Sequence, residues 1–302
     1  MKRVFFVGNR CNVFNTLLSF RELELVNAYV VQNSYLHKLY PAYVTPPVII
    51  GNKDKHSFLE AMQNADFDIL ISNGCPFIIP VSRIKKDHQL FINIHPSSLP
   101  HLKGIHPVNG SLLHRHKELG ATMHYMDDGI DTGSIIHQES VPITEDLDLG
   151  LLYRIAFELE SSVFAGGMKK LISSHFSYLG EKQASLGSYY TRSEEDMFVD
   201  FATMPDRDII TRVRAFGIQG QGTRCVIGNT GYAIFDAEII TNQYLLSRYN
   251  VIDCGSLIFE YDNKLLVKSR DGIIKIKSFK KTDPIGNLNT DSHPSKHREV
   301  EL

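Results

Sequence analysis

The stretch FDILISNGCPFIIPVSRIKKDHQLFINIHP, residues 67–96, decides the fold class of this chain. The apolar runs at its two ends are typical of buried strands, and the segment between them, VSRIKKD, is typical of a short helix. Strands that alternate with helix-sized segments favour a parallel sheet with helices on both faces. The preceding residues repeat the pattern, with strands predicted at 3–8, 25–32 and 46–52 and helices at 12–23 and 56–65. We therefore predict an α/β fold with a Rossmann-like, mostly parallel sheet.

Composition narrows the class of protein. The chain has 302 residues, of which 43% are hydrophobic and 22% are charged, and its formal net charge is −2. A long nucleic acid usually selects a basic excess in its partner, so the charge argues against DNA. No apolar run is long enough to cross a bilayer, and the start MKRVFFVGNR is too quickly polar for a signal peptide. We expect a cytoplasmic protein without membrane partners.

The cysteines predict neither a disulfide framework nor a zinc site, because they are far apart and form no C-x-x-C pair. They are Cys11, Cys75, Cys225 and Cys254.

The pattern changes after residue 120. Two strand-like runs flank an Asp- and Gly-rich loop within residues 120–143, and a long helix is predicted at 149–173, with Asp148 placed to cap it. Further on, a helix at 206–216 precedes mostly strand-like segments, including a hairpin at 263–279. These segments predict a smaller β-rich, partly open barrel-like domain. We expect a catalytic domain at 1–188, a connector at 189–204, the β-rich domain at 205–281 and a mobile tail at 282–302.

Asn93 and His95 are two residues apart at the end of a predicted strand, so their side chains face the same side. Open parallel sheets build their binding clefts at this end of the strands. An amide that donates to a developing oxyanion and an imidazole that exchanges protons suit the attack of an amine on a carbonyl. The alternative is a strand end that leads into an ordinary loop.

Two segments together resemble the signature of the folate-dependent formyltransferases. They are NIHPSSLPHLKG, residues 93–104, and GATMHYMDDGIDTGSII, residues 120–136. The resemblance covers the first 200 residues and is greatest to the sugar-nucleotide N-formyltransferases. It implies a catalytic trio of Asn93, His95 and Asp131, in which Asn93 and His95 stabilise the oxyanion and Asp131 keeps His95 oriented and charged. The alternative for Asp131 is a turn residue that bonds its own backbone.

The same resemblance implies N10-formyltetrahydrofolate as co-substrate, held mainly by backbone groups of two segments. For the first segment, plain core packing is the alternative. The implied contacts are Phe77, Ile78, Ile79, Tyr125, Met126, Asp127, Asp128, Gly129 and Ile130. Six histidines lie between residues 91 and 124. His114 and His116 are two residues apart on a predicted helix and so do not share a face. No acidic or cysteine partner is at ligand spacing, so we expect no metal and take the histidines as surface or substrate-lining residues.

The amine to be formylated is predicted to belong to a nucleotide-linked amino sugar, such as a dTDP-linked 3- or 4-amino-dideoxyhexose. The implied substrate contacts are Arg10, His101, Lys103, Gly104 and His106, and the resemblance implies a homodimer. One alternative is a methionyl-tRNA formyltransferase, which the lysines of the C-terminal hairpin would suit. Another is a folate-binding protein that is non-catalytic or hydrolytic.

Overall fold

A computed structural model describes residues 1–283, which divide into two compact units. The first unit comprises residues 1–108, 117–143 and 153–190, and the second comprises 109–116, 144–152 and 191–283. The first unit is therefore not one continuous stretch of the chain. A tail is predicted at residues 282–302. Its first residue, Thr282, belongs to the last strand, and residues 284–302 lie outside the part of the chain that the structure describes.

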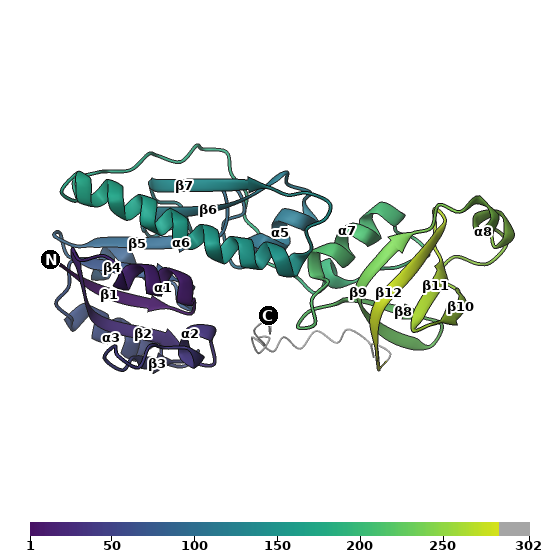
Figure 1. The fold of residues 1–302 in the computed structure, drawn as a ribbon, viewed down its shortest axis with the longest axis horizontal. Coiled ribbons are helices and arrows are strands. Elements are labelled where there is room, and N and C mark those ends of the chain that lie inside the picture. Colours follow the sequence, from purple (N-terminus) through teal and green to yellow (C-terminus); the bar gives the residue numbers. More distant parts are fainter. Residues whose placement is uncertain (284–302) are drawn as a thin grey trace. The chain divides into compact units, whose positions relative to one another are not determined.

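The first unit contains a seven-stranded sheet in the order β3-β2-β1-β4-β5-β6-β7 (Figure 1). The first five strands in this order are parallel to one another; β6 runs antiparallel to β5, and β7 pairs antiparallel with β6 and so runs in the direction of the first five, which confirms a mostly parallel sheet. The bounds are β1 Lys2–Gly8, β2 Leu23–Val31, β3 Val48–Ile50, β4 Ile69–Asn73, β5 Leu90–His95, β6 Glu118–Tyr125 and β7 Ile135–Pro142.

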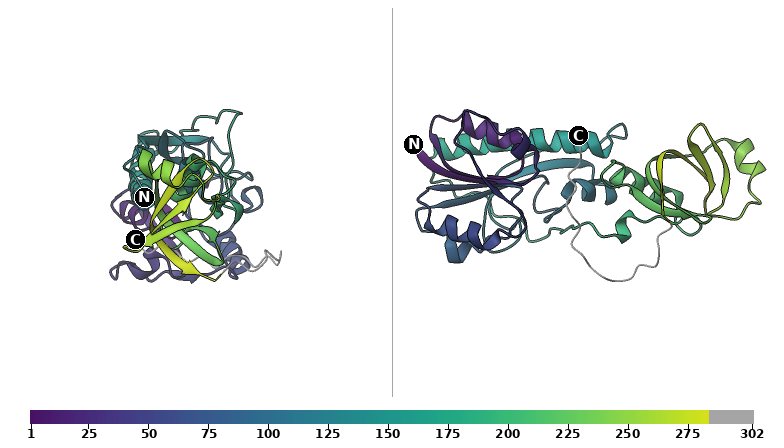
Figure 2. Two further views of the ribbon diagram at one scale, coloured as in Figure 1. Left: turned by 90° about the vertical axis from the view of Figure 1, so that its right-hand side faces the viewer. Right: turned by 90° about the horizontal axis from the view of Figure 1, so that it is seen from below.

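Helices cover both faces of this sheet (Figure 2). Phe14 of α1 and Val163 of α6 are buried against one face, and Phe58 of α3 and Val81 of α4 are buried against the other. The bounds are α1 Cys11–Leu18, α2 Tyr35–Lys38, α3 Lys55–Asn64, α4 Val81–Ile84, α5 Pro107–Leu113 and α6 Leu149–Ser173. None of the helices within residues 1–283 has the length and apolar character needed to span a membrane.

Two helix predictions need correction. The first helix ends at Leu18 and not at residue 23, because Leu23 already pairs with Lys2 in the sheet. His114 and His116 were expected on a helix, but α5 ends at Leu113 and both histidines lie beyond it.

Helix α6 packs closely against β6 and β7 because two of its residues, Gly166 and Gly167, lack side chains. A Cβ on Gly166 would lie 2.4 Å from the ring of His137, and one on Gly167 would lie 2.2 Å from the sulfur of Met123. The helix begins as predicted, since Asp148 Oδ1 accepts the N–H of Leu151 at 2.8 Å.

We expect Gly167→Ala to lower the free energy of unfolding by about 1–3 kcal/mol, because the added methyl overlaps the fully buried Met123. The sign of the change in the free energy of unfolding tests the close packing, because a glycine-to-alanine change inside an unobstructed helix stabilises a protein by about 1 kcal/mol. Urea unfolding measures the difference, and a stabilised variant would show that α6 does not pack this closely.

The second unit contains a five-stranded antiparallel sheet in the order β10-β11-β12-β9-β8, which confirms a β-rich C-terminal domain. Its hairpin turns at Asp271 and Gly272, and Ile274 and Ile276 are buried. The bounds are η1 Glu195–Met197, α7 Asp206–Phe216, β8 Thr223–Ile227, β9 Thr230–Ile239, α8 Gln243–Arg248, β10 Leu257–Tyr261, β11 Lys264–Lys268 and β12 Ile273–Thr282.

Candidate active site

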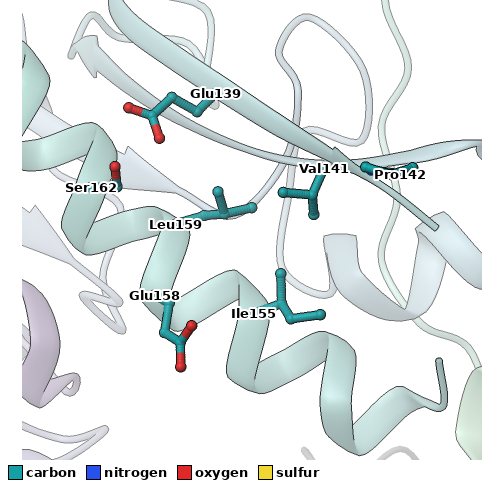
Figure 3. Close-up of a pocket in the computed structure, with 7 residues that line it drawn as sticks. All are labelled: Glu139, Val141, Pro142, Ile155, Glu158, Leu159 and Ser162. Atoms are coloured by element: carbon teal, nitrogen blue, oxygen red, sulfur yellow. The ribbon is translucent and has the colours of Figure 1, made fainter. Parts of the chain in front are cut away.

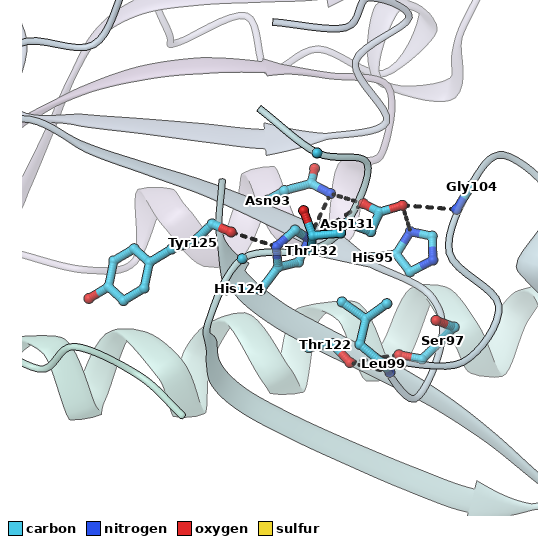
Figure 4. A network of polar contacts seen from close by, with 12 residues as sticks. Asn93, His95, Ser97, Leu99, Gly104, Thr122, His124, Tyr125, Asp131 and Thr132 are labelled. Atoms are coloured by element: carbon cyan, nitrogen blue, oxygen red, sulfur yellow. Dashed lines mark hydrogen bonds and ion pairs between the residues drawn. The ribbon is translucent and has the colours of Figure 1, made fainter. Parts of the chain in front are cut away.

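The three residues implied as catalytic lie together in the first unit (Figure 4). Asn93 and His95 are on β5, and Asp131 is in the loop between β6 and β7. Asn93 Nδ2 donates to Asp131 Oδ1 at 3.2 Å, and His95 Nδ1 is 3.6 Å from Asp131 Oδ2. The side chains of His95 and Asp131 are only 6% and 11% exposed, so these contacts form in a largely desolvated environment.

Two loops meet at the Asp131 carboxylate. The backbone N–H of Gly104 donates to Asp131 Oδ2 at 2.9 Å and so joins the loop after β5 to the loop after β6. Asp131 has φ +54° and Leu102 has φ +56°, a region that residues with side chains rarely adopt. Aspartate tolerates this conformation, but leucine is strained in it, so the surroundings of Leu102 must hold it there.

His124 belongs to the same cluster, although it was expected among surface or substrate-lining histidines. It is 2% exposed and lies opposite Asn93 in the antiparallel pairing of β5 and β6. His124 Nε2 is 3.5 Å from Asp131 Oδ1. The position could have been found from the sequence only with the strand register, because His124 is 31 residues from Asn93.

Hydrogen bonds to backbone carbonyls determine where the ring protons are. A carbonyl oxygen only accepts, so His95 Nε2 donates to Leu102 O at 2.9 Å and His124 Nδ1 donates to Tyr125 O at 2.7 Å. In a neutral His95, Nδ1 is then the proton-accepting atom, and it faces Asp131. In a neutral His124, Nε2 is the acceptor.

The Asn93 amide is not a free donor. Its Nδ2 is 3.2 Å from Asp131 Oδ1 and also 3.2 Å from His124 Nε2. Both amide hydrogens therefore have partners within the protein. An oxyanion would have to displace one of these two contacts to receive a hydrogen bond from Asn93.

The protonation states differ from the expected ones. Burial lowers the pKa of His95 more than Asp131 and the bond with Leu102 raise it, so its pKa lies below the ordinary 6.5. Burial by itself raises the pKa of Asp131, but the two histidines and the Gly104 N–H lower it more, so its pKa is well below the usual range. The lowered pKa of the His95 ring favours a neutral imidazole beside the Asp131 carboxylate at neutral pH, whereas the family resemblance implies an imidazolium.

The two segments implied to hold folate lie side by side. Phe77 and Met126 pack against the same cluster of buried residues, and Asp128 Oδ1 accepts the N–H of Ser82 at 3.0 Å. Core packing explains part of the first segment, since Ile79 is only 3% exposed, whereas Ile78 is 64% exposed. In the second segment Tyr125 is half-buried and Asp127, Gly129 and Ile130 are exposed. Backbone groups and apolar side chains at such a surface suit a flat heterocycle.

Arg10 has a buried partner that the sequence did not indicate. Its guanidinium is 3.1 Å from Glu160 Oε1 of α6 and lies 4.7 Å from the centre of the Phe157 ring. Glu160 is fully buried, and burial raises its pKa to about 7 even though Arg10 and Asn73 lower it. The Arg10 cation also acts on the active site, because it contributes to the lowered pKa of His95.

The remaining residues implied as substrate contacts follow β5. His101 is exposed and His106 is half-buried. Lys103 is 8% exposed, and its ammonium is 5.3 Å from the centre of the Tyr189 ring. Its side chain therefore does not extend into solvent. Gly104 has φ +105° and donates its backbone N–H to Asp131.

A surface pocket of about 400 Å³ lies between β7 and α6 and is not part of this cluster (Figure 3). None of the predicted site residues lines it. Its lining is Glu139, Val141, Pro142, Ile155, Glu158, Leu159 and Ser162. Within residues 1–283 no three His, Cys, Asp or Glu side chains are grouped so that they could hold a metal ion.

Comparison with known proteins assigns the chain to a family. The model of the formyl transferase family matches residues 49–166, and the model of the formyl transferase C-terminal domain matches residues 192–284. The chain belongs to the formyltransferase family.

Relatives of this formyltransferase-family chain include methionyl-tRNA formyltransferases and an N-formyltransferase of known structure. Methionyl-tRNA formyltransferases of Syntrophus aciditrophicus and Syntrophomonas wolfei are 32% and 28% identical over 46% and 70% of the chain. The matches span only 44% and 65% of those two relatives, so less than two thirds of their length is covered. The structure of an N-formyltransferase from Helicobacter canadensis, in complex with folinic acid and dTDP-3-aminofucose, has a TM-score of 0.66 at 21% identity and covers 91% of this chain and 98% of that one.

The buried Glu160 of this formyltransferase-family chain predicts a pH-dependent stability. A pKa raised from 4.5 to about 7 means that the folded state favours the protonated carboxyl, so the stabilisation is complete below pH 4.5 and is lost as the pH rises through 7. Glu160→Gln should flatten this decline, whose slope is at most about 1.4 kcal/mol per pH unit. Urea unfolding at several pH values measures how the free energy of unfolding depends on pH. Glu158→Gln, an exposed control on the same helix, should keep the wild-type profile.

Proposed function

We propose that this protein transfers a formyl group from N10-formyltetrahydrofolate to the amine of a nucleotide-linked amino sugar. The observation that carries the proposal is the convergence of Asn93, His95, His124 and Asp131 in one desolvated cluster. A desolvated site strengthens each electrostatic interaction with a charge that develops during the reaction. Family membership supports formyl transfer by this cluster.

The chemistry requires an oxyanion donor and a proton acceptor. The amine nitrogen bonds to the formyl carbon, and the carbonyl oxygen takes up the displaced electron pair. When the oxyanion collapses, the bond from the formyl carbon to N10 breaks. The proton lost by the amine balances the one gained by N10, so the products are a formamide and tetrahydrofolate. No oxidant or reductant is needed.

The neutral form of His95 suits the proton transfer. With Nε2 donating to Leu102 O, Nδ1 receives the proton of the attacking amine, and the nearby Asp131 carboxylate stabilises the imidazolium that results. Asn93 turns one N–H from Asp131 or His124 to the developing oxyanion. The geometry therefore favours His95 as a base and Asn93 as the principal oxyanion donor.

The folate co-substrate fits the loops beside this cluster. Tetrahydrofolate supplies the formyl group and a flat pterin, while the chain supplies apolar surface and backbone donors and acceptors. Ile78 and Ile130 are 64% and 47% exposed, and Ile130 directly precedes Asp131. Exposed apolar side chains next to a polar cluster mark a binding surface. We infer that these two loops hold the pterin.

Length and charge favour a sugar nucleotide over tRNA. The Helicobacter canadensis enzyme, solved with dTDP-3-aminofucose, is matched over almost its whole length. Two lysines of the C-terminal hairpin, which tRNA would need, contact acidic side chains: Lys275 pairs with Glu238 and Lys277 with Asp236. Paired lysines release fewer counterions from a phosphate backbone. The second candidate, methionyl-tRNA formyltransferase, is favoured by the sequence relatives.

A panel of amines tests the proposal. The protein is incubated with N10-formyltetrahydrofolate and dTDP-, UDP- or GDP-linked amino sugars or methionyl-tRNA, and formamide products are detected by mass spectrometry. We expect formylation of a sugar nucleotide. Turnover of methionyl-tRNA alone, with a steep dependence on salt, would establish the second candidate. Free formate without any formamide would indicate a hydrolase.

Asn93→Ala should lower kcat by about 10²–10³-fold, because it removes the oxyanion donor. The folate affinity should change little, since Asn93 is not among the residues proposed to hold the pterin. Single-turnover kinetics and folate titration separate the two effects. Unchanged formylation by this variant would remove Asn93 from the mechanism.

The pH–rate profile tests the state of His95. If neutral His95 is the base, kcat/KM should fall at low pH with a midpoint below 6.5, because burial lowers the pKa of the ring. Asp131→Asn should shift the midpoint still lower, since the Asp131 charge raises that pKa. Arg10→Leu should shift it upward, because the Arg10 cation lowers that pKa. Shifts in the same direction for both variants would contradict this assignment.

A further inference from the structure

Residues 181–190, which we call the clamp segment, contact both loops that meet at Asp131. The segment follows α6 in the sequence and ends directly before Thr191, where the last stretch of the second unit begins. Glu181 pairs with Ile135, and each backbone N–H donates to the other residue's carbonyl at 2.8 Å. Further along, Lys103 and Tyr189 form a parallel bridge. None of the residues singled out in the sequence as catalytic or ligand-binding lies in this segment.

Gln183 holds the loop that carries Asp131. Its amide nitrogen donates to the carbonyl of Asp131 and to the carbonyl of Gly133, both at 2.8 Å. These two bonds fix the backbone on either side of Thr132, where Asp131 has φ +54°. The loop is closed at its base by the N–H of Tyr125, which donates to Ser134 O at 2.9 Å. Gln183 thus sets the direction of the Asp131 side chain through hydrogen bonds to the backbone of its loop.

Ser188 holds the loop that carries the partner of His95. Its hydroxyl oxygen accepts the N–H of Leu102, and its carbonyl accepts the N–H of Lys103, both at 2.9 Å. Leu102 is 5% exposed and strained at φ +56°, and its carbonyl accepts the proton of His95 Nε2. A strained residue keeps its conformation only where the surroundings fix it.

We propose that Ser188 and Gln183 are positioning residues of the formyl-transfer site. Ser188 fixes the Leu102 carbonyl so that His95 carries its proton on Nε2 and presents Nδ1 toward Asp131, while Gln183 fixes the Asp131 backbone. This inference rests on the proposed function for its kinetic consequence, but the contacts exist independently of it. Neither residue contacts the reacting groups; each acts through a residue that does.

The two side chains can be tested separately from the backbone contacts of the clamp. Ser188→Ala removes only the bond to the Leu102 N–H, because the Ser188 carbonyl still accepts from Lys103 and the Ser188 N–H still donates to Pro100 O. Ser188→Thr keeps the hydroxyl and should restore function. Ser185→Ala makes the same chemical change at an exposed position three residues away and is the matched control.

The imidazole of His95 provides a readout that does not depend on activity. Nitrogen NMR on the ¹⁵N-labelled full chain should show the Nε2–H tautomer in the wild type and a loss of this preference in Ser188→Ala. The Leu102 bond raises the pKa of His95, so its loss should lower the titration midpoint of the ring. The charged or titratable groups that act on the ring, Asp131, His124 and Arg10, remain in place.

Kinetics complete the test. We expect Ser188→Ala and Gln183→Ala to lower kcat by about 10- to 100-fold with KM changed by less than about twofold, because the reacting groups move while the binding surfaces remain. Ser188→Thr and Ser185→Ala should stay near the wild type. Gln63→Ala, on the exposed side of α3, is the control for the glutamine.

Each remaining outcome decides the proposal. Unchanged kcat and an unchanged His95 tautomer in Ser188→Ala would overturn it, as would an Nδ1–H tautomer in the wild type. Parallel losses of kcat, folate affinity and melting temperature would assign the clamp a purely structural role and also overturn it. A tautomer shift in a protein whose wild type formylates nothing would support the positioning and reject the proposed function.

Discussion

A carboxylate buried between two histidines is the constraint on which the site depends. Desolvation of an ionised aspartate is costly unless charged groups and donors surround it. Asp131 receives N–H groups from Asn93 and Gly104 and faces the rings of His95 and His124. These partners come from two neighbouring strands and one loop, and Asp131 itself lies in a second loop. The carboxylate can remain ionised only if all four elements keep their relative positions.

The change of strand direction within the sheet supplies this arrangement. In a wholly parallel sheet β6 would run in the same direction as β5, whereas the antiparallel β6 returns beside β5 and sets His124 opposite Asn93. The close approach of α6, which the glycines at 166 and 167 allow, then places Glu160 beside Arg10. The clamp segment that follows α6 completes the site by holding both loops. The positions of the reacting groups therefore depend on contacts between distant parts of the chain.

Burial also decides the protonation states. An aspartate next to an imidazole favours the imidazolium when both are in water, and this reasoning predicted a charged His95 from the sequence. In the folded chain desolvation disfavours the charge on the ring more strongly than Asp131 favours it. The result is a neutral base beside a carboxylate that can stabilise it once it is protonated. Such a pair is suited to taking a proton from an ammonium group during the reaction.

The sequence by itself determined the order of the main strands and helices of the first unit, because periodicity and turn residues are local properties of the chain. It also indicated Asn93, His95 and Asp131, since strand alternation and a family motif can be read without coordinates. Only the tertiary structure decided that His124 adjoins these groups, that Glu160 contacts Arg10, and that Gln183 and Ser188 hold the loops of the site. Those contacts join residues 31 to 150 positions apart, and strand register and helix packing, which bring them together, leave no local pattern.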